Sequence, residues 1–313
     1  MNKLTVSSSP HIHTKDTTNR IMLDVIIALL PAAIAGVVIF GWRALLVVLT
    51  TVAASVLSEL VFNIIVKKEQ TISDLSAVVT GLLLALNLPA TAPIWQCVIG
   101  AVFAIVVVKC LFGGLGCNFA NPAITARIFL MISFTSTIGV GALPVAQNGG
   151  ELITGATPLA AMKDMSVEGL PSLLDMFFGV RGGAIGESCI LALLLGFAYL
   201  VVRRVIHFET PLIFISTVFV LTMIITNDPL LSLYHLMAGG LVLGAVFMAT
   251  DYVTTPITRT GKMIFAAGCG LITVLIRMYG SYPEGVSFSI LLMNILSPYI
   301  EKWTAPKALG GKK

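Results

Sequence analysis

A short polar segment, Thr154-Gly155-Ala156-Thr157-Pro158, stands between two long apolar runs and carries two hydroxyl groups. Pro158 biases Thr157 toward an extended backbone, and Gly155 and Ala156 leave space beside the Thr157 hydroxyl. A bulky group could therefore be attached covalently to this oxygen. Gly, Thr and Pro are also ordinary residues of a surface turn, so the segment alone leaves both interpretations open.

A second candidate site is the glycine-rich segment 113–123, which reads GGLGCNFANPA. Glycines let the backbone approach a ligand closely, and the amides of Asn118 and Asn121 both donate and accept, as reading a uracil-like ring edge requires. Asn121 before Pro122 is equally typical of a capped helix start, and the two interpretations are compatible. Arg127, about one turn further on, could hold an anion or lie at the inner membrane surface.

Four ionisable residues lie within or at the ends of apolar runs: Glu59, Asp74, Lys109 and Asp251. Charged residues at membrane depth are candidates for function, although Lys109 could extend to the membrane surface instead. Asp74 and Asp251 have Ser and Thr neighbours, and such oxygen-rich surroundings suit sodium. We therefore consider both as part of an ion path, with helix capping for Asp74 and interfacial solvation for Asp251 as the alternatives.

The composition indicates the kind of structural elements that hold these candidate residues in place. Of 313 residues 57% are hydrophobic and 11% are charged, whereas soluble domains carry about 25% charged residues. The chain is therefore predicted to be an all-α polytopic membrane protein. We expect about ten spans of the length that a bilayer requires, near residues 21–40, 44–66, 76–89, 93–112, 123–140, 185–202, 210–226, 235–250, 262–278 and 286–302.

The basic residues predict how these spans are oriented. With the N-terminus inside, fifteen of the nineteen Lys and Arg residues fall on inner segments and four on outer ones, as the positive-inside rule requires. Both termini are therefore expected in the cytoplasm and the loop 141–184 outside. Residues 1–20 are polar, so we expect no cleavable signal peptide. The five cysteines lack metal-ligand spacing, and most lie in apolar runs, so they are predicted to be buried free thiols.

Ten spans divide into two halves of five, and an odd number per half makes the halves inverted copies, a common transporter design. The expected division has a cytoplasmic N-terminal segment and a first half, an extracytoplasmic loop for cofactor attachment, a second half and a basic cytoplasmic tail. These are residues 1–20, 21–140, 141–184, 185–303 and 304–313 respectively.

Three segments together resemble one known family. They are TGATPLA at 154–160, FGGLGCNFANPAITAR at 112–127 and FMATDYVTTP at 247–256. The family contains the D subunit of the Rnf electron-transport complex and the B subunit of the sodium-pumping NADH:quinone oxidoreductase. The resemblance covers essentially the whole chain, and the ten-span count agrees with it. Only about twenty residues precede the first span, which favours the Rnf branch.

The resemblance implies a function for the first two segments. The last threonine of the family's [Ser/Thr]-Gly-Ala-Thr motif carries FMN through a phosphoester bond made by a flavin transferase, and it corresponds to Thr157. A second, non-covalent flavin, riboflavin, is implied near Asn118 and Asn121, because the family's quinone-reductase branch holds riboflavin there. The implied partners are the flavin- and iron–sulfur-bearing subunits of a complex that couples electron flow between ferredoxin and NAD to sodium or proton export across a bacterial cytoplasmic membrane.

Two other functions are compatible with the sequence. The family's two-repeat fold resembles that of urea transporters, so a solute channel or secondary transporter without redox function is the main alternative. A purely structural membrane subunit is the third. The distinguishing feature is Thr157, because a transporter needs no site for flavin attachment.

Overall fold

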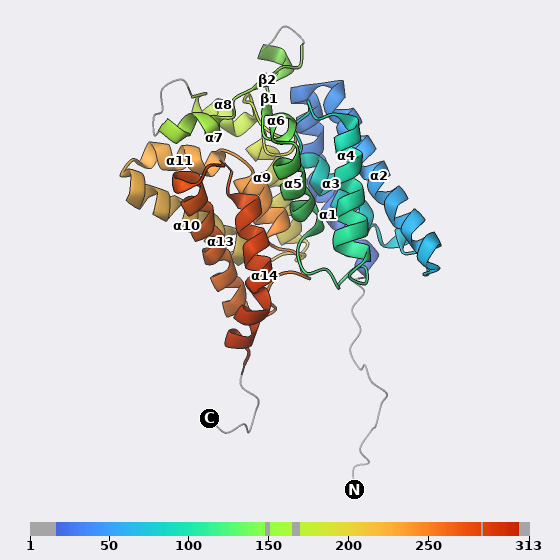
Figure 1. The fold of residues 1–313 in the computed structure, drawn as a ribbon. Coiled ribbons are helices and arrows are strands. Elements are labelled where there is room, and N and C mark those ends of the chain that lie inside the picture. The colour runs from blue at the N-terminus through green and yellow to red at the C-terminus, as the bar shows by residue number, and fades with distance from the viewer. Residues whose placement is uncertain (1–16, 148–150, 165–169, 283, 307–313) are drawn as a thin grey trace.

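The computed structural model describes residues 17–147, 151–164, 170–282 and 284–306, and within them the chain is mostly helical (Figure 1). Each of the ten predicted spans coincides with a helix or a broken helix. In the first half these are α1 (Thr18–Phe40), α2 (Trp42–Val66), α3 (Ser76–Leu86), α4 (Ile94–Val102) continued by the π-helix η2 (Phe103–Cys110), and α5 (Pro122–Ser133); a 3-10 turn, η1 (Ile72–Asp74), precedes α3.

The second half contains α9 (Ile190–Val202), α10 (Glu209–Thr226), α11 (Pro229–Met237), α12 (Leu241–Leu243) continued by the π-helix η5 (Gly244–Met248), α13 (Arg259–Tyr279) and α14 (Val286–Thr304). The eighth predicted span is bent by 63° between Met237 and Leu241. Gly239 makes this break possible because its φ of +66° is strained for any residue with a side chain.

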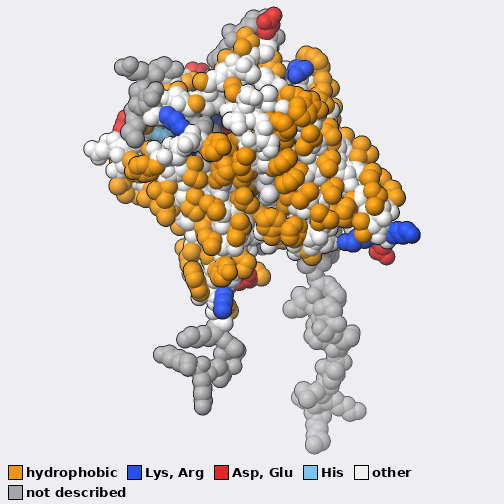
Figure 2. Space-filling view, viewed as in Figure 1, with side chains coloured by type: hydrophobic (Ala, Val, Ile, Leu, Met, Phe, Trp, Pro, Cys, Tyr) orange, Lys and Arg blue, Asp and Glu red, His pale blue; other side chains and the backbone are white. Residues whose placement is uncertain are grey.

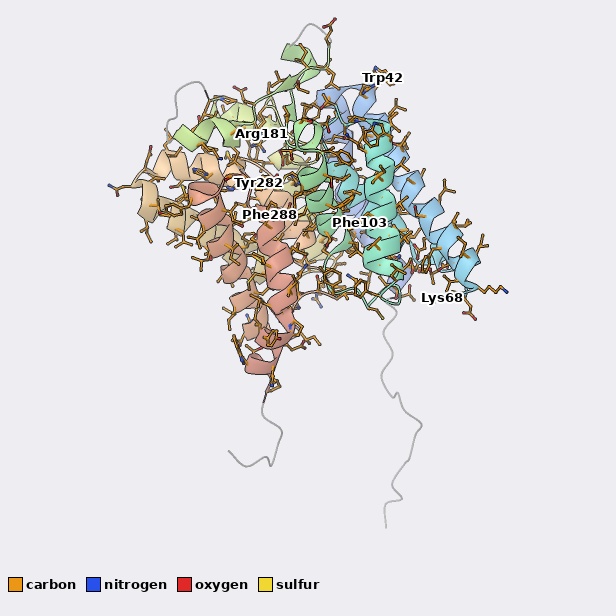
Figure 3. All side chains as sticks on the ribbon, viewed as in Figure 1. Trp42, Lys68, Phe103, Arg181, Tyr282 and Phe288 are labelled. Carbon is orange, nitrogen blue, oxygen red and sulfur yellow. The ribbon has the colours of Figure 1, made fainter. Side chains whose placement is uncertain are left out.

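Short elements connect the halves and gather at one end of the molecule, at the top of Figure 1. They are α6 (Thr135–Ile138), β1 (Gly141–Ala142), the 3-10 turn η3 (Val145–Gln147), β2 (Thr154–Gly155), α7 (Pro158–Ala161), the 3-10 turn η4 (Met162–Asp164) and α8 (Leu173–Phe178). We call this the loop end. Lys68, after α2, lies at the opposite end, whereas Trp42, at the start of α2, lies near the loop end (Figure 3).

The surface between the two ends is apolar. Figure 2 shows hydrophobic side chains covering the flank of the helices, with charged side chains mostly toward the two ends. Val38 is 78% exposed and Ile224 71%. Soluble proteins rarely expose apolar surface on this scale, so the flank is that of a membrane protein. By length and hydropathy, four of the described helices can cross a bilayer, and a fifth crossing is formed if the bent pair counts as one.

The two halves pack most closely where α1 meets α9. A methyl group added at Gly196 would lie 2.2 Å from the carbonyl oxygen of Ala28, so the two helix backbones touch. The buried carboxylate of Asp24 accepts a hydrogen bond of 2.8 Å from the Tyr199 hydroxyl and pairs with Arg203 at 3.1 Å. A glycine contact and a buried ion pair therefore join the first helix of each half.

Candidate functional site

Thr157 has the local geometry that its sequence predicts. Its backbone is extended, with φ −75° and ψ 151°, and it caps α7, where its hydroxyl oxygen accepts a hydrogen bond of 3.3 Å from the Ala160 N–H. Just before it, β2 pairs antiparallel with β1, so that Thr154 lies opposite Ala142. Thr157 is half-buried, whereas Thr154 is exposed. The motif therefore places one of its two hydroxyls against the protein and the other in solvent.

Gly141 fixes the position of Thr157. A methyl group added at Gly141 would lie 2.7 Å from Cγ2 of Thr157 and 3.1 Å from the backbone nitrogen of Gly183. Ala142 and Gly183 exchange two backbone hydrogen bonds of 3.1 and 3.0 Å. The Thr157 segment is thus tied through β1 to the residues that lead into α9.

Thr157 also lines a cavity of about 230 Å³, which we call the Thr157 pocket. Its other walls come from the segment after α3, from α5, α6 and α7, and from the segments before α9, α12 and α14. Apolar and aromatic walls are formed by Met131, Ile138, Leu159 and Tyr282, and polar ones by Asn87, Arg127, Glu187 and Glu284. Both halves of the chain therefore contribute to this pocket.

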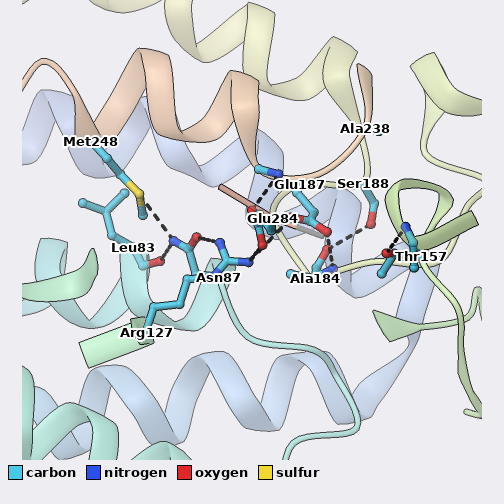
Figure 4. A network of polar contacts seen from close by, with 12 residues as sticks. Leu83, Asn87, Arg127, Thr157, Ala184, Glu187, Ser188, Ala238, Met248 and Glu284 are labelled. Carbon is cyan, nitrogen blue, oxygen red and sulfur yellow. Dashed lines mark hydrogen bonds and ion pairs between the residues drawn. The ribbon is translucent and has the colours of Figure 1, made fainter. Parts of the chain in front are cut away.

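A buried charge network lies in the pocket wall (Figure 4). Arg127 forms an ion pair with Glu284 and donates a second hydrogen bond to the side-chain oxygen of Asn87. The other Glu284 oxygen accepts from the Gly240 N–H at 3.0 Å. Glu187 lies 4.0 Å from Arg127, and its Oε1 accepts from the Ala184 N–H at 3.0 Å. One cation thus faces two carboxylates.

Arg127 does not line the same pocket as Asn118 and Asn121. Arg127 lies six residues beyond Asn121 on α5, about 9 Å further along the helix axis at 1.5 Å per residue, and it lines the pocket of Thr157 instead. It also is not at a membrane surface, because it is only 7% exposed. Sequence reasoning missed Asn87, Glu187 and Glu284 as site residues, although Glu187 lies inside a predicted span and its charge was the available signal.

Asn118 and Asn121 do come together, and they line a second cavity of about 110 Å³, the Asn121 pocket. The predicted helix cap is confirmed, since Oδ1 of Asn121 accepts hydrogen bonds of 3.0 and 3.4 Å from the N–H groups of Ala123 and Ile124. The Asn118 amide donates to the carbonyl of Ala120 at 3.0 Å. Other walls are formed by Ser76, Thr80, Lys109, Phe247 and Asp251.

Lys109 does not extend to the membrane surface. Its ammonium group donates to both oxygens of Glu59 at 2.9 Å and to the Ser76 hydroxyl at 2.6 Å, and both charged residues are buried. Glu59 also accepts from the Thr71 hydroxyl at 2.7 Å. The two ionisable residues singled out separately in the sequence are thus one buried ion pair beside the Asn121 pocket.

Comparison with known proteins shows the family. Residues 5–310 match the family described as NQR2, RnfD, RnfE. The chain belongs to this family. It is 49% identical to the D subunit of the Na(+)-translocating ferredoxin:NAD(+) oxidoreductase complex of Acetobacterium woodii, over 99% of this chain and 96% of that protein. It is 42% identical to the proton-translocating counterpart of Clostridium ljungdahlii, over 100% and 98%, and 39% identical to the D subunit of the ion-translocating oxidoreductase complex of Stutzerimonas stutzeri, over 95% and 93%.

The match of this chain to the NQR2, RnfD, RnfE family spans both pockets, so the resemblance found in the three sequence segments is confirmed. The two aspartates proposed for an ion path are not neighbours in one pocket. Asp251 lines the Asn121 pocket and accepts from the Thr254 hydroxyl at 3.0 Å. Asp74 accepts from the Ser76 N–H at 2.8 Å at the start of α3, although the N-cap residue of that helix is Leu75. Among the described residues, no three His, Cys, Asp or Glu side chains group as metal ligands would.

The cysteine prediction for this family member holds in part. Cys97, Cys110 and Cys269 are buried free thiols, as expected, but Cys189 is only half-buried and Cys117 is exposed. Cys117 follows Gly116, whose φ of +90° turns the chain outward before α5. Its thiol is therefore accessible to reagents.

Proposed function

We propose that this chain is the membrane subunit of an ion-translocating oxidoreductase complex of the ferredoxin:NAD type and that it carries FMN on the Thr157 hydroxyl through a phosphoester. Three relatives that match over nearly their whole length are named as the D subunits of ion-translocating oxidoreductase complexes, two of them of the ferredoxin:NAD(+) type. The supporting observation in this chain is that Thr157, and not Thr154, lines a pocket with both apolar and charged walls.

The dimensions of the Thr157 pocket support this proposal. Its volume of about 230 Å³ is close to the lower end of the 300–1,000 Å³ usual for ligand sites, and the covalent bond leaves only part of the molecule to be enclosed. A flavin supplies one- and two-electron transfer, and the protein supplies its position and electrostatic surroundings. Thr157 would hold the phosphate, while β1, β2 and Gly141 fix Thr157 itself.

The helix contacts support a pair of five-helix inverted repeats and ten crossings. In the first half α2 packs on both α3 and α4, and in the second α10 packs on both α11 and α13. Across the halves, α1 packs on α9 and α5 on α14, which join equivalent members of the two series. Proteins built from inverted repeats have their functional sites at the interface between the repeats. Both pockets lie between the two halves of this chain.

We further propose that the loop end faces the extracytoplasmic side of the cytoplasmic membrane and that both termini are cytoplasmic. Supporting this, thirteen of the fifteen Lys and Arg residues that remain when the buried Lys109, Arg127, Arg181 and Arg277 are left out fall on inner segments in this orientation. The partners would be the flavin- and iron–sulfur-bearing subunits of the complex and, during maturation, a flavin transferase.

The Asn121 pocket is our proposed site for riboflavin, and Asp74 and Asp251 remain proposed members of the ion path. The pocket brings Asn118, Asn121 and Asp251 together. Its volume of about 110 Å³ is well below the usual range for ligands. Riboflavin binding would therefore require the apolar walls, such as Phe247, to move.

The experiment is in-gel flavin fluorescence of the full chain co-expressed with a flavin transferase. The denatured wild-type band should fluoresce, Thr157→Ala should abolish the signal, and Thr154→Ser should keep it as the matched hydroxyl control. A non-fluorescent wild-type band, or a fluorescent Thr157→Ala band, would refute the attachment and favour a channel or structural role.

A further inference from the structure

We propose that the Thr157 pocket encloses the ring of the flavin attached there, and that Arg127 and Glu187 face its pyrimidine edge and set its redox potential in opposite directions. This inference rests on the proposed attachment of FMN to Thr157. It adds a binding mode and two potential-determining residues, neither of which follows from the attachment alone.

The first observation is a buried acceptor that receives no hydrogen bond. Glu187 is 7% exposed, and its Oε1 is fixed by the Ala184 N–H. Its Oε2 is buried and has no hydrogen-bond partner within the described residues, and Glu187 lines the Thr157 pocket. Buried polar groups almost always have a partner. An acceptor left over in the wall of a pocket suits a ligand that brings a donor.

The second observation is that a donor lies beside this acceptor. The Arg127 guanidinium is 4.0 Å from Glu187 Oε2 and lines the same pocket. The pyrimidine edge of a flavin ring carries two carbonyl acceptors with one N–H donor between them. A guanidinium next to a carboxylate offers the complementary pattern of donors and an acceptor. The flat faces of the ring would contact Met131, Ile138 and Tyr282.

Arg127 and Glu187 are both held in place before any ligand arrives, and Glu187 is held by its hydrogen bond from the Ala184 N–H. Arg127 is bonded to Asn87 and Glu284, and Glu284 is bonded to the Gly240 N–H. A methyl group added at Gly240 would lie 2.8 Å from Glu284 and 3.3 Å from Arg127, so the network is packed against the backbone. Side chains that are already fixed lose little conformational entropy when a ligand binds.

Two other arginines lie near the network but donate their hydrogen bonds to backbone carbonyl groups. Arg181 donates to the carbonyl oxygens of Met237, Glu187 and Ser188. Arg277 donates to the carbonyl oxygens of His235 and Ala238. Neither lines the Thr157 pocket, and among the described lining residues Arg127 is the cation. The charge facing a ring in the pocket therefore comes from Arg127, Glu187 and Glu284.

The two residues should shift the potential oppositely. Reduction adds negative charge to the ring, so a nearby cation favours the reduced form and a nearby carboxylate disfavours it. Arg127→Gln should lower the midpoint potential of the attached flavin, and Glu187→Gln should raise it. We expect at least a tenfold change in the oxidised-to-reduced ratio, which is about 30 mV for a two-electron couple.

The measurement is spectroelectrochemical titration of the purified full chain co-expressed with a flavin transferase, with the spectrum of Thr157→Ala subtracted. Arg43→Gln is the matched control. It removes a positive charge near the same end of the molecule, from a separate pocket that Phe40 and Thr91 line, and should leave the potential unchanged. Iodide quenching of flavin fluorescence in the folded protein should be weak in the wild type because the ring is enclosed.

The outcomes separate the two proposals. A wild-type band without flavin refutes the attachment itself. If the wild-type band is fluorescent, the attachment stands. The ring site alone is then refuted if Arg127→Gln and Glu187→Gln both leave the midpoint potential unchanged, or if iodide quenches the native flavin as strongly as free FMN. Because Arg127→Gln leaves two carboxylates facing each other, it is paired with Arg127→Lys, which keeps the charge and should keep the potential within a few millivolts. If Arg127→Gln does not fold, the expected rise of the midpoint potential in Glu187→Gln still tests the ring site.

Discussion

The ammonium group of Lys109 lies 2.9 Å from each carboxylate oxygen of Glu59, and both residues are buried. The pair joins α2 to η2, and through Ser76 it reaches the start of α3. Removing one member of a buried ion pair leaves the other charge uncompensated. The pair therefore couples three helices of the first half electrostatically.

Lys109→Met should lower the free energy of unfolding by about 3–5 kcal/mol, the usual cost of stranding a buried charge. The double variant Lys109→Met/Glu59→Gln should recover part of this loss. Thermal unfolding in detergent measures both. The control is Arg259→Gln, whose pair with Glu209 leaves the arginine 78% exposed and should contribute little. Equal losses for Lys109→Met and the double variant would contradict the coupling.

Two variants of Asn121 separate its cap from its proposed contact with riboflavin. Asn121→Asp keeps an oxygen for the Ala123 and Ile124 N–H groups but removes the amide donor, whereas Asn121→Ala removes both. We expect the free energy of unfolding to fall by about 1 kcal/mol in Asn121→Ala and to stay nearly unchanged in Asn121→Asp. The amount of acid-extractable riboflavin should fall in both variants. Riboflavin retained by both variants would leave Asn121 as a helix cap alone.

Gly141→Ala should disturb Thr157 without touching its hydroxyl. The new methyl group would lie 2.7 Å from Thr157 Cγ2 and 3.1 Å from the backbone of Gly183, and such overpacking costs about 1–3 kcal/mol. We expect weaker flavin fluorescence per protein on a gel at unchanged expression. The comparison is Gly268→Ala, in α13 and away from the motif, whose methyl group would meet the flexible side chain of Met293. A flavin yield equal to the wild type's for Gly141→Ala would show that the contact is dispensable.

The proposed orientation can be tested by labelling two cysteine thiols, one at each end of the molecule. In a background without the other native cysteines, Glu151→Cys at the loop end should react with a membrane-impermeant maleimide in intact cells. Native Cys117, which is exposed, should react only after lysis, because it lies on an inner segment in this orientation. The reverse labelling pattern would overturn the proposed topology.

The positions of the helices could be predicted from sequence because a bilayer demands long apolar segments, whose ends are marked by local chemistry. Asn121 before Pro122 caps α5 as predicted, and Thr157 before Pro158 also caps a helix, α7. Such caps depend on neighbours within three residues. The prediction of an extended backbone at Thr157 holds for the same reason.

The charge networks could not be predicted, since their members meet only in the folded chain. Arg127 and Glu284 are 157 residues apart, and Glu59 and Lys109 are 50 apart. Arg127 is only six residues from Asn121 along the chain, but the rise along α5 places it in the other pocket. Extension of Lys109 to the membrane surface assumes that no acidic partner is within reach, and Glu59 is such a partner.

The contact between Asp24 and Arg203 has a consequence for biosynthesis. Arg203 follows Asp24 by 179 residues, and a ribosome adds roughly 5–20 residues per second. For roughly 10–40 s, then, the nascent first half carries the Asp24 carboxylate before its partners Tyr199 and Arg203 have been synthesised. Completion of α9 is thus the first moment at which α1 can form this contact with the second half.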